Sequence, residues 1–269
     1  MQKRILIVSQ EVFPYIPDGT IPQSVLELAK VVKKNKDVEV RLFMPKYGCV
    51  NERRHQLHEV IRLSGVNIVV NDIDQPLIVK VASIPQARLQ VYFIDNDEYF
   101  QRKLILTNKE KELLGDNDER MIFFCRGVLE TLQMLGWSPD IIHCHGWFTS
   151  LLPLYLKNIY MGHPVFENTT VLSSLYKQSF RGLLNPDLIE KIKFDGIEDN
   201  ETLDLIKKPN VESLYKMAAK FSDGVIFEQG YKSVGLTNFV NNNNLPLLSP
   251  MELDEYYSFY EKFFSEALV

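Results

Sequence analysis

The order of elements at the start of the chain constrains its fold more than any other feature. Residues 4–9 form a short apolar run between polar residues, which predicts a buried strand, and a proline-containing loop follows. Apolar side chains recur at intervals of three and four over residues 22–34 and predict a helix, and residues 38–44 predict a second strand. A strand, a loop, a helix and another strand in this order are typical of a parallel, doubly wound sheet.

The middle of the chain is rich in β-branched residues and alternates between apolar and polar positions. Short connections join these segments, with Asn71, Asp72 and Pro85 among the turn residues. Because short connections suit antiparallel neighbours, we expect antiparallel β-hairpins inserted beside or within the parallel sheet. The expected strands are residues 55–63, 66–70, 77–82 and 89–94.

The rest of the chain alternates again between helices and strands, so we expect a single Rossmann-like α/β domain over residues 1–269. A long amphipathic helix is expected at 116–135, with acidic residues in its first turn, where the helix dipole favours them. The polar segment 181–210 is expected to leave the sheet. A C-terminal helix rich in Phe and Tyr, within residues 251–268, is expected to pack on the domain. The other expected elements are strands at 140–144, 170–175, 224–227 and 245–248, and helices at 147–160, 211–221 and 231–239.

Charge and cysteine content exclude several classes of protein. The chain has 30 basic and 35 acidic residues, a net charge of −5 at pH 7, without a dense basic run. We therefore expect neither nucleic acid nor a membrane as a partner. Cys49, Cys125 and Cys144 are odd in number and form no C-x-x-C pair, which favours reduced thiols and a cytoplasmic location. No apolar run has the length of a signal peptide or of a membrane span.

The loop after the first strand is the first candidate for ligand binding, because ligands of open parallel sheets bind at the carboxyl ends of the strands. Gly19 and Thr20 precede the first expected helix, whose N-terminus could hold an anion. The loop has no G-x-G-x-x-G or P-loop pattern, and Pro17 and Pro22 lack an N–H group. A purely structural turn is the favoured alternative.

Two histidines at the end of a later strand form a second candidate. His143 and His145 are two residues apart, so their side chains point to the same side of the sheet. A third metal ligand is missing nearby, and we predict no metal site; hydrogen-bonded structure is the favoured alternative. The ring of Trp147 could stack on a sugar or could lie in the core, and neither alternative is favoured.

A third candidate follows the strand at 89–94. Asp95 and Asn96 could bind sugar hydroxyl groups, but a helix cap with a turn is the favoured alternative. Tyr99 lies in the same segment.

Several motifs, in their order, resemble one family, the N-terminal half of bacterial glycogen and starch synthases. The resemblance spans about residues 3–235. It implies one half of a two-domain glycosyltransferase fold that moves glucose from ADP-glucose to an α-1,4-glucan with retention of configuration. No cofactor is implied, and Tyr47 and Tyr99 join the candidate substrate-binding residues. The matching segments are S-x-E-x-x-P at 9–14, M-P-x-Y at 44–47, F-x-D-x-x-x-Y-F at 93–100, the helix signature at 119–126, D-h-x-H-x-H-D-W at 140–147 and the strand entry at 221–225.

The chain also departs from the pattern of this family at charged positions. The donor-binding K-x-G-G corresponds to Pro17-Asp18-Gly19-Thr20, the aspartate before Trp147 is Gly146, and the histidine of T-V-H-N is Leu175. The second domain has no counterpart in the 269 residues. We therefore expect weak or no transfer by the chain alone.

Three functions and several partners remain open at this point. The favoured one is a glucosyltransferase domain, active alone or with a separately encoded second half. The alternative is a non-catalytic glucan-binding or regulatory partner in glycogen metabolism. Binding of a nucleotide sugar without transfer is the least favoured. The expected partners are an α-glucan or nucleotide sugar, a second-domain protein, or a second copy in a homodimer.

Overall fold

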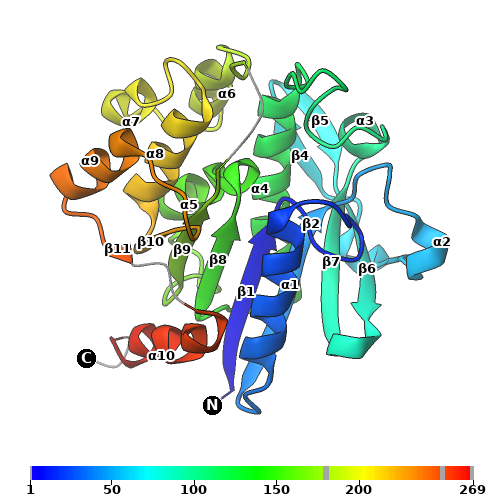
Figure 1. Ribbon diagram of the computed structural model, residues 1–269. Coiled ribbons are helices and arrows are strands. Elements are labelled where there is room, and N and C mark those ends of the chain that lie inside the picture. Colours follow the sequence, from blue (N-terminus) through cyan, green and yellow to red (C-terminus); the bar gives the residue numbers. More distant parts are fainter. Residues whose placement is uncertain (1, 178–181, 249–251, 267–269) are drawn as a thin grey trace.

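The computed structural model describes residues 2–177, 182–248 and 252–266 and contains one large twisted sheet (Figure 1). Within these residues the sheet has nine strands in the order β11-β10-β9-β8-β1-β2-β7-β6-β3. The strands from β11 to β7 run parallel, whereas β6 and β3 run antiparallel to their neighbours. The parallel, doubly wound sheet is confirmed. The strands are β1 Lys3–Ser9, β2 Val38–Pro45, β3 His58–Glu59, β6 Ile78–Ile84, β7 Leu89–Asp95, β8 Ile141–His145, β9 Thr170–Leu175, β10 Gly224–Phe227 and β11 Leu247–Leu248.

Helices cover both faces of this sheet. α1 and α10 pack together on one face, and α4, α5 and α8 form the layer on the other. The alternation of β8 shows the two faces, because His143 points to α10 and Cys144 points to Cys125 of α4. The helices are α1 Thr20–Lys33, α2 Glu52–His55, α3 Asp97–Phe100, α4 Asn117–Leu135, α5 Leu151–Tyr155, α6 Leu188–Phe194, α7 Asn200–Asp204, α8 Val211–Phe221, α9 Val234–Asn242 and α10 Tyr256–Glu266.

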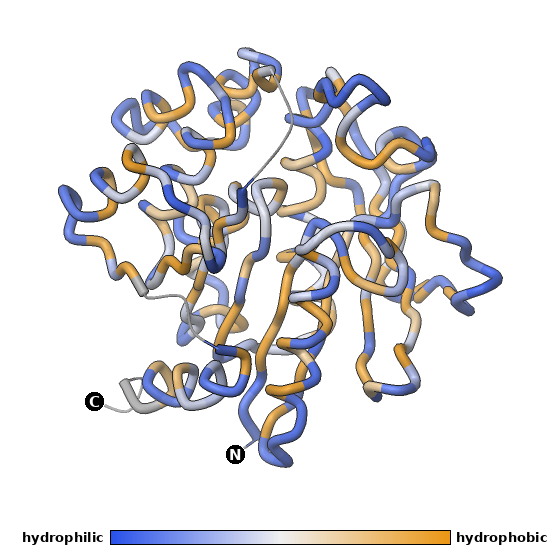
Figure 2. The backbone as a smooth tube through the Cα atoms, in the orientation of Figure 1, coloured by the Kyte–Doolittle hydropathy of each residue, from blue (hydrophilic) through white to orange (hydrophobic). Residues whose placement is uncertain are grey.

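The core lies between the sheet and these helix layers. β1 is buried from Ile5 to Ser9, as expected for a strand covered on both faces. Figure 2 shows apolar residues along the strands and along the inward side of α1, with hydrophilic residues on the outer side. Among the described residues, no helix is long and apolar enough to cross a membrane. The cytoplasmic location remains a prediction.

The expected hairpin region lies at one edge of the sheet, but its details differ from the prediction. β7 pairs antiparallel with β6 and parallel with β2, so it belongs to both parts of the sheet. Residues 55–63 are not one strand: they contain the end of α2, the two-residue strand β3 and a 3-10 turn at Ile61–Leu63. Hairpin β4 Asn67–Val70 with β5 Ile73–Pro76 forms a separate two-stranded sheet. β5 was missed because three of its four residues are polar or proline.

The observed ends of several helices differ from the expected ends for local reasons. The helix expected at 147–160 is a 3-10 turn at Trp147–Thr149, then α5, then a π-helical turn at Leu156–Tyr160. α9 begins at Val234 because the Ser233 hydroxyl accepts a hydrogen bond from the Leu236 amide. The segment 182–210 holds α6 and α7 away from the sheet, as expected. The C-terminal helix is preceded by a 3-10 turn at Leu253–Glu255, and the expected limits at residues 251 and 268 lie outside the described part.

Candidate functional site

The carboxyl ends of the parallel strands meet at one edge of the sheet, at the upper end of β1 in Figure 1. The loops after β1, β2, β7, β8, β9 and β10 all leave from this edge. It is therefore the edge at which an open sheet of this kind binds ligands. All of the candidate residues from the sequence lie on the ends of these strands or in these loops.

The loop after β1 brings a carboxyl group to the N-terminus of α1. Gly19 has φ +112°, and the position its Cβ would take lies 3.6 Å from Glu11 Oε2. Burial raises the pKa of Glu11 to about 7, although a hydrogen bond from Gln10 opposes the rise. Gly19 and Thr20 are exposed. The exposed Pro17 stands where the family has a lysine, and the loop therefore offers no cation to a phosphate.

Tyr47, after β2, is fully buried. Its ring centre is 6.0 Å from that of Phe100 and 5.7 Å from the guanidinium carbon of Arg120. Burial raises the pKa of Tyr47, and its hydroxyl has no hydrogen-bond partner among the described residues. The structure therefore places Tyr47 beneath the loops and not at their surface.

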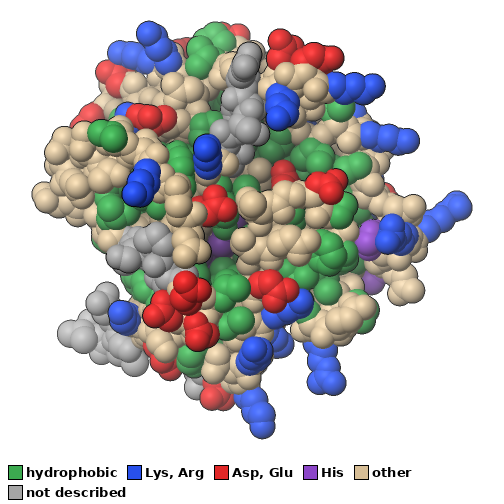
Figure 3. Space-filling model, viewed as in Figure 1, with side chains coloured by type: hydrophobic (Ala, Val, Ile, Leu, Met, Phe, Trp, Pro, Cys, Tyr) green, Lys and Arg blue, Asp and Glu red, His purple; other side chains and the backbone are tan. Residues whose placement is uncertain are grey.

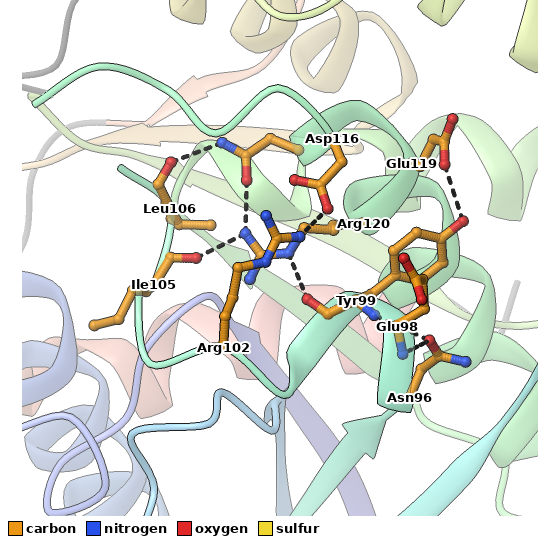
Figure 4. Close-up of polar contacts among 10 residues, drawn as sticks. Asn96, Glu98, Tyr99, Arg102, Ile105, Leu106, Asp116, Glu119 and Arg120 are labelled. Carbon is orange, nitrogen blue, oxygen red and sulfur yellow. Dashed lines mark hydrogen bonds and ion pairs between the residues drawn. The ribbon is translucent and has the colours of Figure 1, made fainter. Parts of the chain in front are cut away.

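The segment after β7 uses its polar groups within the protein. Asn96 is the N-cap of α3: its Oδ1 accepts hydrogen bonds from the amides of Glu98 and Tyr99, at 2.9 and 3.0 Å (Figure 4). Asp95 lies 2.9 Å from Lys80 Nζ, and burial raises its pKa while Lys80 opposes the rise. The Tyr99 hydroxyl donates to Glu119 Oε2 at 3.1 Å.

Arg120 is a buried cation that the sequence did not single out as functional. It donates to the carbonyl oxygens of Tyr99 and Ile105 at 2.9 and 2.7 Å, and to Asn117 Oδ1 at 2.7 Å (Figure 4). Burial lowers its pKa. Beside it, Arg102 and Asp116 form an ion pair. Arg120 therefore joins the loop after α3 to the start of α4, and its only signal in the sequence was its place in the helix signature.

The two histidines of β8 lie together on one face, as the spacing predicts. Their ring centres are 4.0 Å apart. His143 Nδ1 lies 2.6 Å from the Tyr260 hydroxyl and His143 Nε2 lies 2.8 Å from Ser174 Oγ, whereas His145 Nδ1 lies 2.8 Å from the Tyr176 hydroxyl.

Burial determines the charge of the two histidines. Burial lowers the pKa of both rings, that of His145 to about 3, so both are neutral at pH 7. In the described part of the chain, no group of three or more His, Cys, Asp or Glu side chains could hold a metal.

Trp147 and its neighbours form the floor of the β8 loop. Trp147 is 1% exposed, and its ring meets Phe148 edge to face at 5.5 Å. Gly146 has φ +86°, and a Cβ at this position would lie 2.3 Å from Gln10 Oε1. The side chain of Gln10 thus fills the space in which an aspartate would stand. Leu175, at the end of β9, is 1% exposed and belongs to the core.

A pocket of about 340 Å³ lies beside the histidines, at the ends of β9 and β10. Its lining comes from these strand ends, from α1 and from the start of the C-terminal segment. The residues are Ser24, Ser174, Tyr176, Ile226, Phe227, Glu228, Gln229, Glu252, Leu253 and Tyr256.

The fold has a solved counterpart. The catalytic domain of starch synthase IV from Arabidopsis thaliana superposes with a TM-score of 0.77 at 19% sequence identity, covering 95% of this chain and 53% of that one. The chain is therefore one half of a two-domain glycosyltransferase fold. The family model of the starch synthase catalytic domain matches residues 4–229, and the chain belongs to this family.

Curated relatives support the same assignment over a shorter stretch. Glycogen synthase from Chlorobium limicola is 37% identical over 191 residues, which are 70% of this chain and 39% of the relative. Glycogen synthase from Chlorobaculum tepidum is 34% identical over 209 residues, which are 73% of this chain and 42% of the relative. The chain thus spans about two fifths of the length of these relatives.

Proposed function

We propose that this chain is a glucosyltransferase domain that supports transfer of glucose from ADP-glucose to an α-1,4-glucan. Membership of the starch synthase catalytic domain family, over residues 4–229, carries this proposal. The solved starch synthase domain, which is bound to ADP and acarbose, supports a nucleotide-linked donor. The domain contributes one wall of a cleft, and a second domain, in the same or another polypeptide, contributes the other. No cofactor takes part.

The domain alone transfers glucose weakly or not at all. Departure of a nucleoside diphosphate requires positive charge or hydrogen-bond donors aimed at the leaving oxygens. Loss of one such charged or donor group lowers the rate by about 100-fold or more. Here the loop after β1 has Pro17 in place of a lysine, and Leu175 takes the place of a histidine. Without a second domain opposite it, this domain by itself also cannot orient donor against acceptor.

A second candidate function is non-catalytic binding of a glucan, or regulation of another protein of glycogen metabolism. The Gln10–Gly146 pair favours it, because Gln10 fills the space of the absent aspartate. In this case the family fold is kept for binding while the charged groups for chemistry are replaced.

Two measurements on the purified chain test these functions. Radiolabelled ADP-glucose and glycogen are incubated with the chain, alone and with cell extract, and glycogen co-sedimentation is measured in parallel. Label entering glycogen only with extract supports the transferase domain, and co-sedimentation without any transfer supports the second candidate. If neither transfer nor co-sedimentation is observed, both candidate functions are refuted. Pro17→Lys is the matched variant: it restores a cation and should raise transfer by the domain if phosphate charge is what limits it.

A further inference from the structure

The edge of the sheet formed by β6 and β3 carries a group of basic side chains that the proposed function does not use. The group lies in residues 52–66, which comprise α2, β3, the 3-10 turn and the start of the next connection. Arg53, Arg54 and Arg62 are all exposed, and Glu59 is the one acidic residue that follows α2 in this stretch. Figure 3 shows Lys and Arg side chains, with His beside them, at the end of the molecule at which α2 lies in Figure 1.

The charges of these three arginines are not balanced by contacts within the domain. Among the residues that the structure describes, none of the three guanidinium groups forms an ion pair or a hydrogen bond. The carboxylate of Glu52, in the same helix, is already paired with Lys46 at 2.6 Å and with Lys80 at 2.9 Å. Burial and, to a smaller extent, the charge of Arg54 lower the pKa of His55. This part of the surface is therefore positive, although the whole chain has a net charge of −5.

Exposed apolar side chains accompany the arginines. Ile61, which precedes Arg62, is 83% exposed, and Val66 in the same connection is 40% exposed. Apolar side chains together with arginine are typical of the sites at which two proteins meet, and arginine is enriched among the residues that contribute most to binding. Arg53, Arg54, Arg62 and Ile61 together form the edge surface.

The backbone that presents Ile61 is held in place by the sheet. The Val60 amide donates to the Val79 carbonyl oxygen at 2.8 Å, and the Ser64 amide donates to the Ile61 carbonyl oxygen at 3.1 Å. The Ser64 hydroxyl donates to the Val60 carbonyl oxygen at 3.2 Å. Leu63, which ends the 3-10 turn, is 1% exposed and anchors the turn in the core. Since this backbone is already ordered, a partner that contacts Ile61 pays little to fix it.

The chemistry of the edge surface selects one kind of partner. Three arginines are few for a nucleic acid or an anionic membrane, and the net charge of −5 opposes the approach of either. A short acidic segment needs no more than this, because each guanidinium group can bind a carboxylate through two N–H groups. An apolar side chain within such a segment would cover Ile61.

We propose that the edge surface binds an extended acidic segment of another protein, with carboxylates on the three arginines and an apolar side chain on Ile61. The inference goes beyond the proposed function, because none of the candidate site residues and none of the segments that match the family motifs lies within residues 52–66. In the sheet, β2, β7 and β6 separate β3 from β1. A partner bound at β3 would therefore leave the carboxyl ends of β1 and β8 free.

Fluorescence anisotropy of a labelled peptide, with one leucine between two pairs of glutamates, tests the edge surface of the full chain at physiological salt. Wild type should bind the peptide, and the triple variant Arg53→Gln, Arg54→Gln, Arg62→Gln should bind it about tenfold or more weakly, since each exposed ion pair contributes about threefold. Ile61→Ser should weaken binding about fivefold. The matched control is Arg88→Gln, an exposed arginine at the other end of β6, which should leave binding unchanged.

Several results would overturn the proposal. They are absence of peptide binding by wild type at protein concentrations up to about 1 mM, equal weakening by Arg88→Gln and by the triple variant, or equal binding of a peptide with glutamine in place of each glutamate. Preference for phosphatidylserine vesicles over the peptide, or self-association in sedimentation velocity that the triple variant abolishes, would give the surface another occupant and reject the acidic segment.

These outcomes are separable from failure of the proposed function. The changed side chains are exposed, so the triple variant should keep the circular dichroism spectrum of wild type and its co-sedimentation with glycogen. Loss of peptide binding with co-sedimentation unchanged supports the edge surface as a separate site. Loss of both together would place the arginines in the glucan function and reject the separate site.

Discussion

Gly146→Ala should destabilise the protein strongly, because the backbone conformation at Gly146 and the neighbouring side chain of Gln10 both disfavour a side chain at this position. Its φ of +86° and ψ of 166° lie in a region that is open almost only to glycine, and a side chain there costs about 1–3 kcal/mol. The new Cβ would also lie 2.3 Å from Gln10 Oε1, and overpacking of this kind costs about 1–3 kcal/mol. We expect a total loss of about 3 kcal/mol, or roughly 6–12 °C in Tm.

The contact with Gln10 makes this loss separable into its two parts. Gln10→Ala alone should cost about 1 kcal/mol, because Gln10 is buried and accepts a hydrogen bond from the Phe148 amide at 3.4 Å. The double variant should lose only about 2 kcal/mol, since the alanine at 146 then occupies the space that Gln10 has left. Urea unfolding followed by circular dichroism gives all three values.

A control and a refuting result complete this prediction. Gly136 has φ +58°, but its Cβ would meet nothing within 4 Å, so Gly136→Ala should cost only about 1 kcal/mol and should add to Gln10→Ala. If the costs of Gln10→Ala and Gly146→Ala also added to within about 0.5 kcal/mol, Gln10 would not fill the position of the missing side chain.

Three further changes test other parts of the structure. Burial raises the pKa of Glu11 to about 7, so the contribution of Glu11 to stability is present below its unfolded pKa and is lost as the pH rises through 7. In urea unfolding, Glu11→Gln should therefore increase the free energy of unfolding by about 1–2 kcal/mol at pH 8 and leave it unchanged at pH 4. An equal increase at both pH values would contradict this prediction. Arg120→Lys should lose about 3 kcal/mol because an ammonium cannot reach both carbonyl groups and Asn117, and full stability by thermal melting would disprove it. Phe264, 8% exposed beside Lys3, anchors α10, so Phe264→Ser should cost about 3 kcal/mol and cause aggregation in light scattering; a monomeric, equally stable variant would show that α10 is dispensable.

Regular parts of the fold could be predicted because their signals are local. The buried strand β9 and the helix α8 follow from apolar spacing alone and have the predicted ends. Asn71 and Asp72 were expected to turn, and both have positive φ between β4 and β5. The strand after this turn was missed, since its pairing, and not its apolar pattern, defines it.

The candidate site could be predicted only in part, because its contacts join distant residues. The spacing of His143 and His145 gives their common side, but the Tyr260 hydroxyl that pairs with His143 comes from a helix 117 residues later. Asn96 gave a clear cap signal, and it caps α3. Nothing local predicts that Glu252 and Tyr256 lie beside Tyr176, because a C-terminal segment can pack on either face of a sheet.

The two outermost strands of the sheet bear on how copies of the chain can meet. Among the described residues, β3 and β11 end the sheet with two residues each, and both side chains of β3 are exposed and polar. Edge strands of two residues offer few free amide and carbonyl groups to another polypeptide. Short edge strands of this kind prevent the sheets of different molecules from pairing into fibres. A homodimer of this chain would therefore be built through helices or loops, and its subunits would not share one continuous sheet.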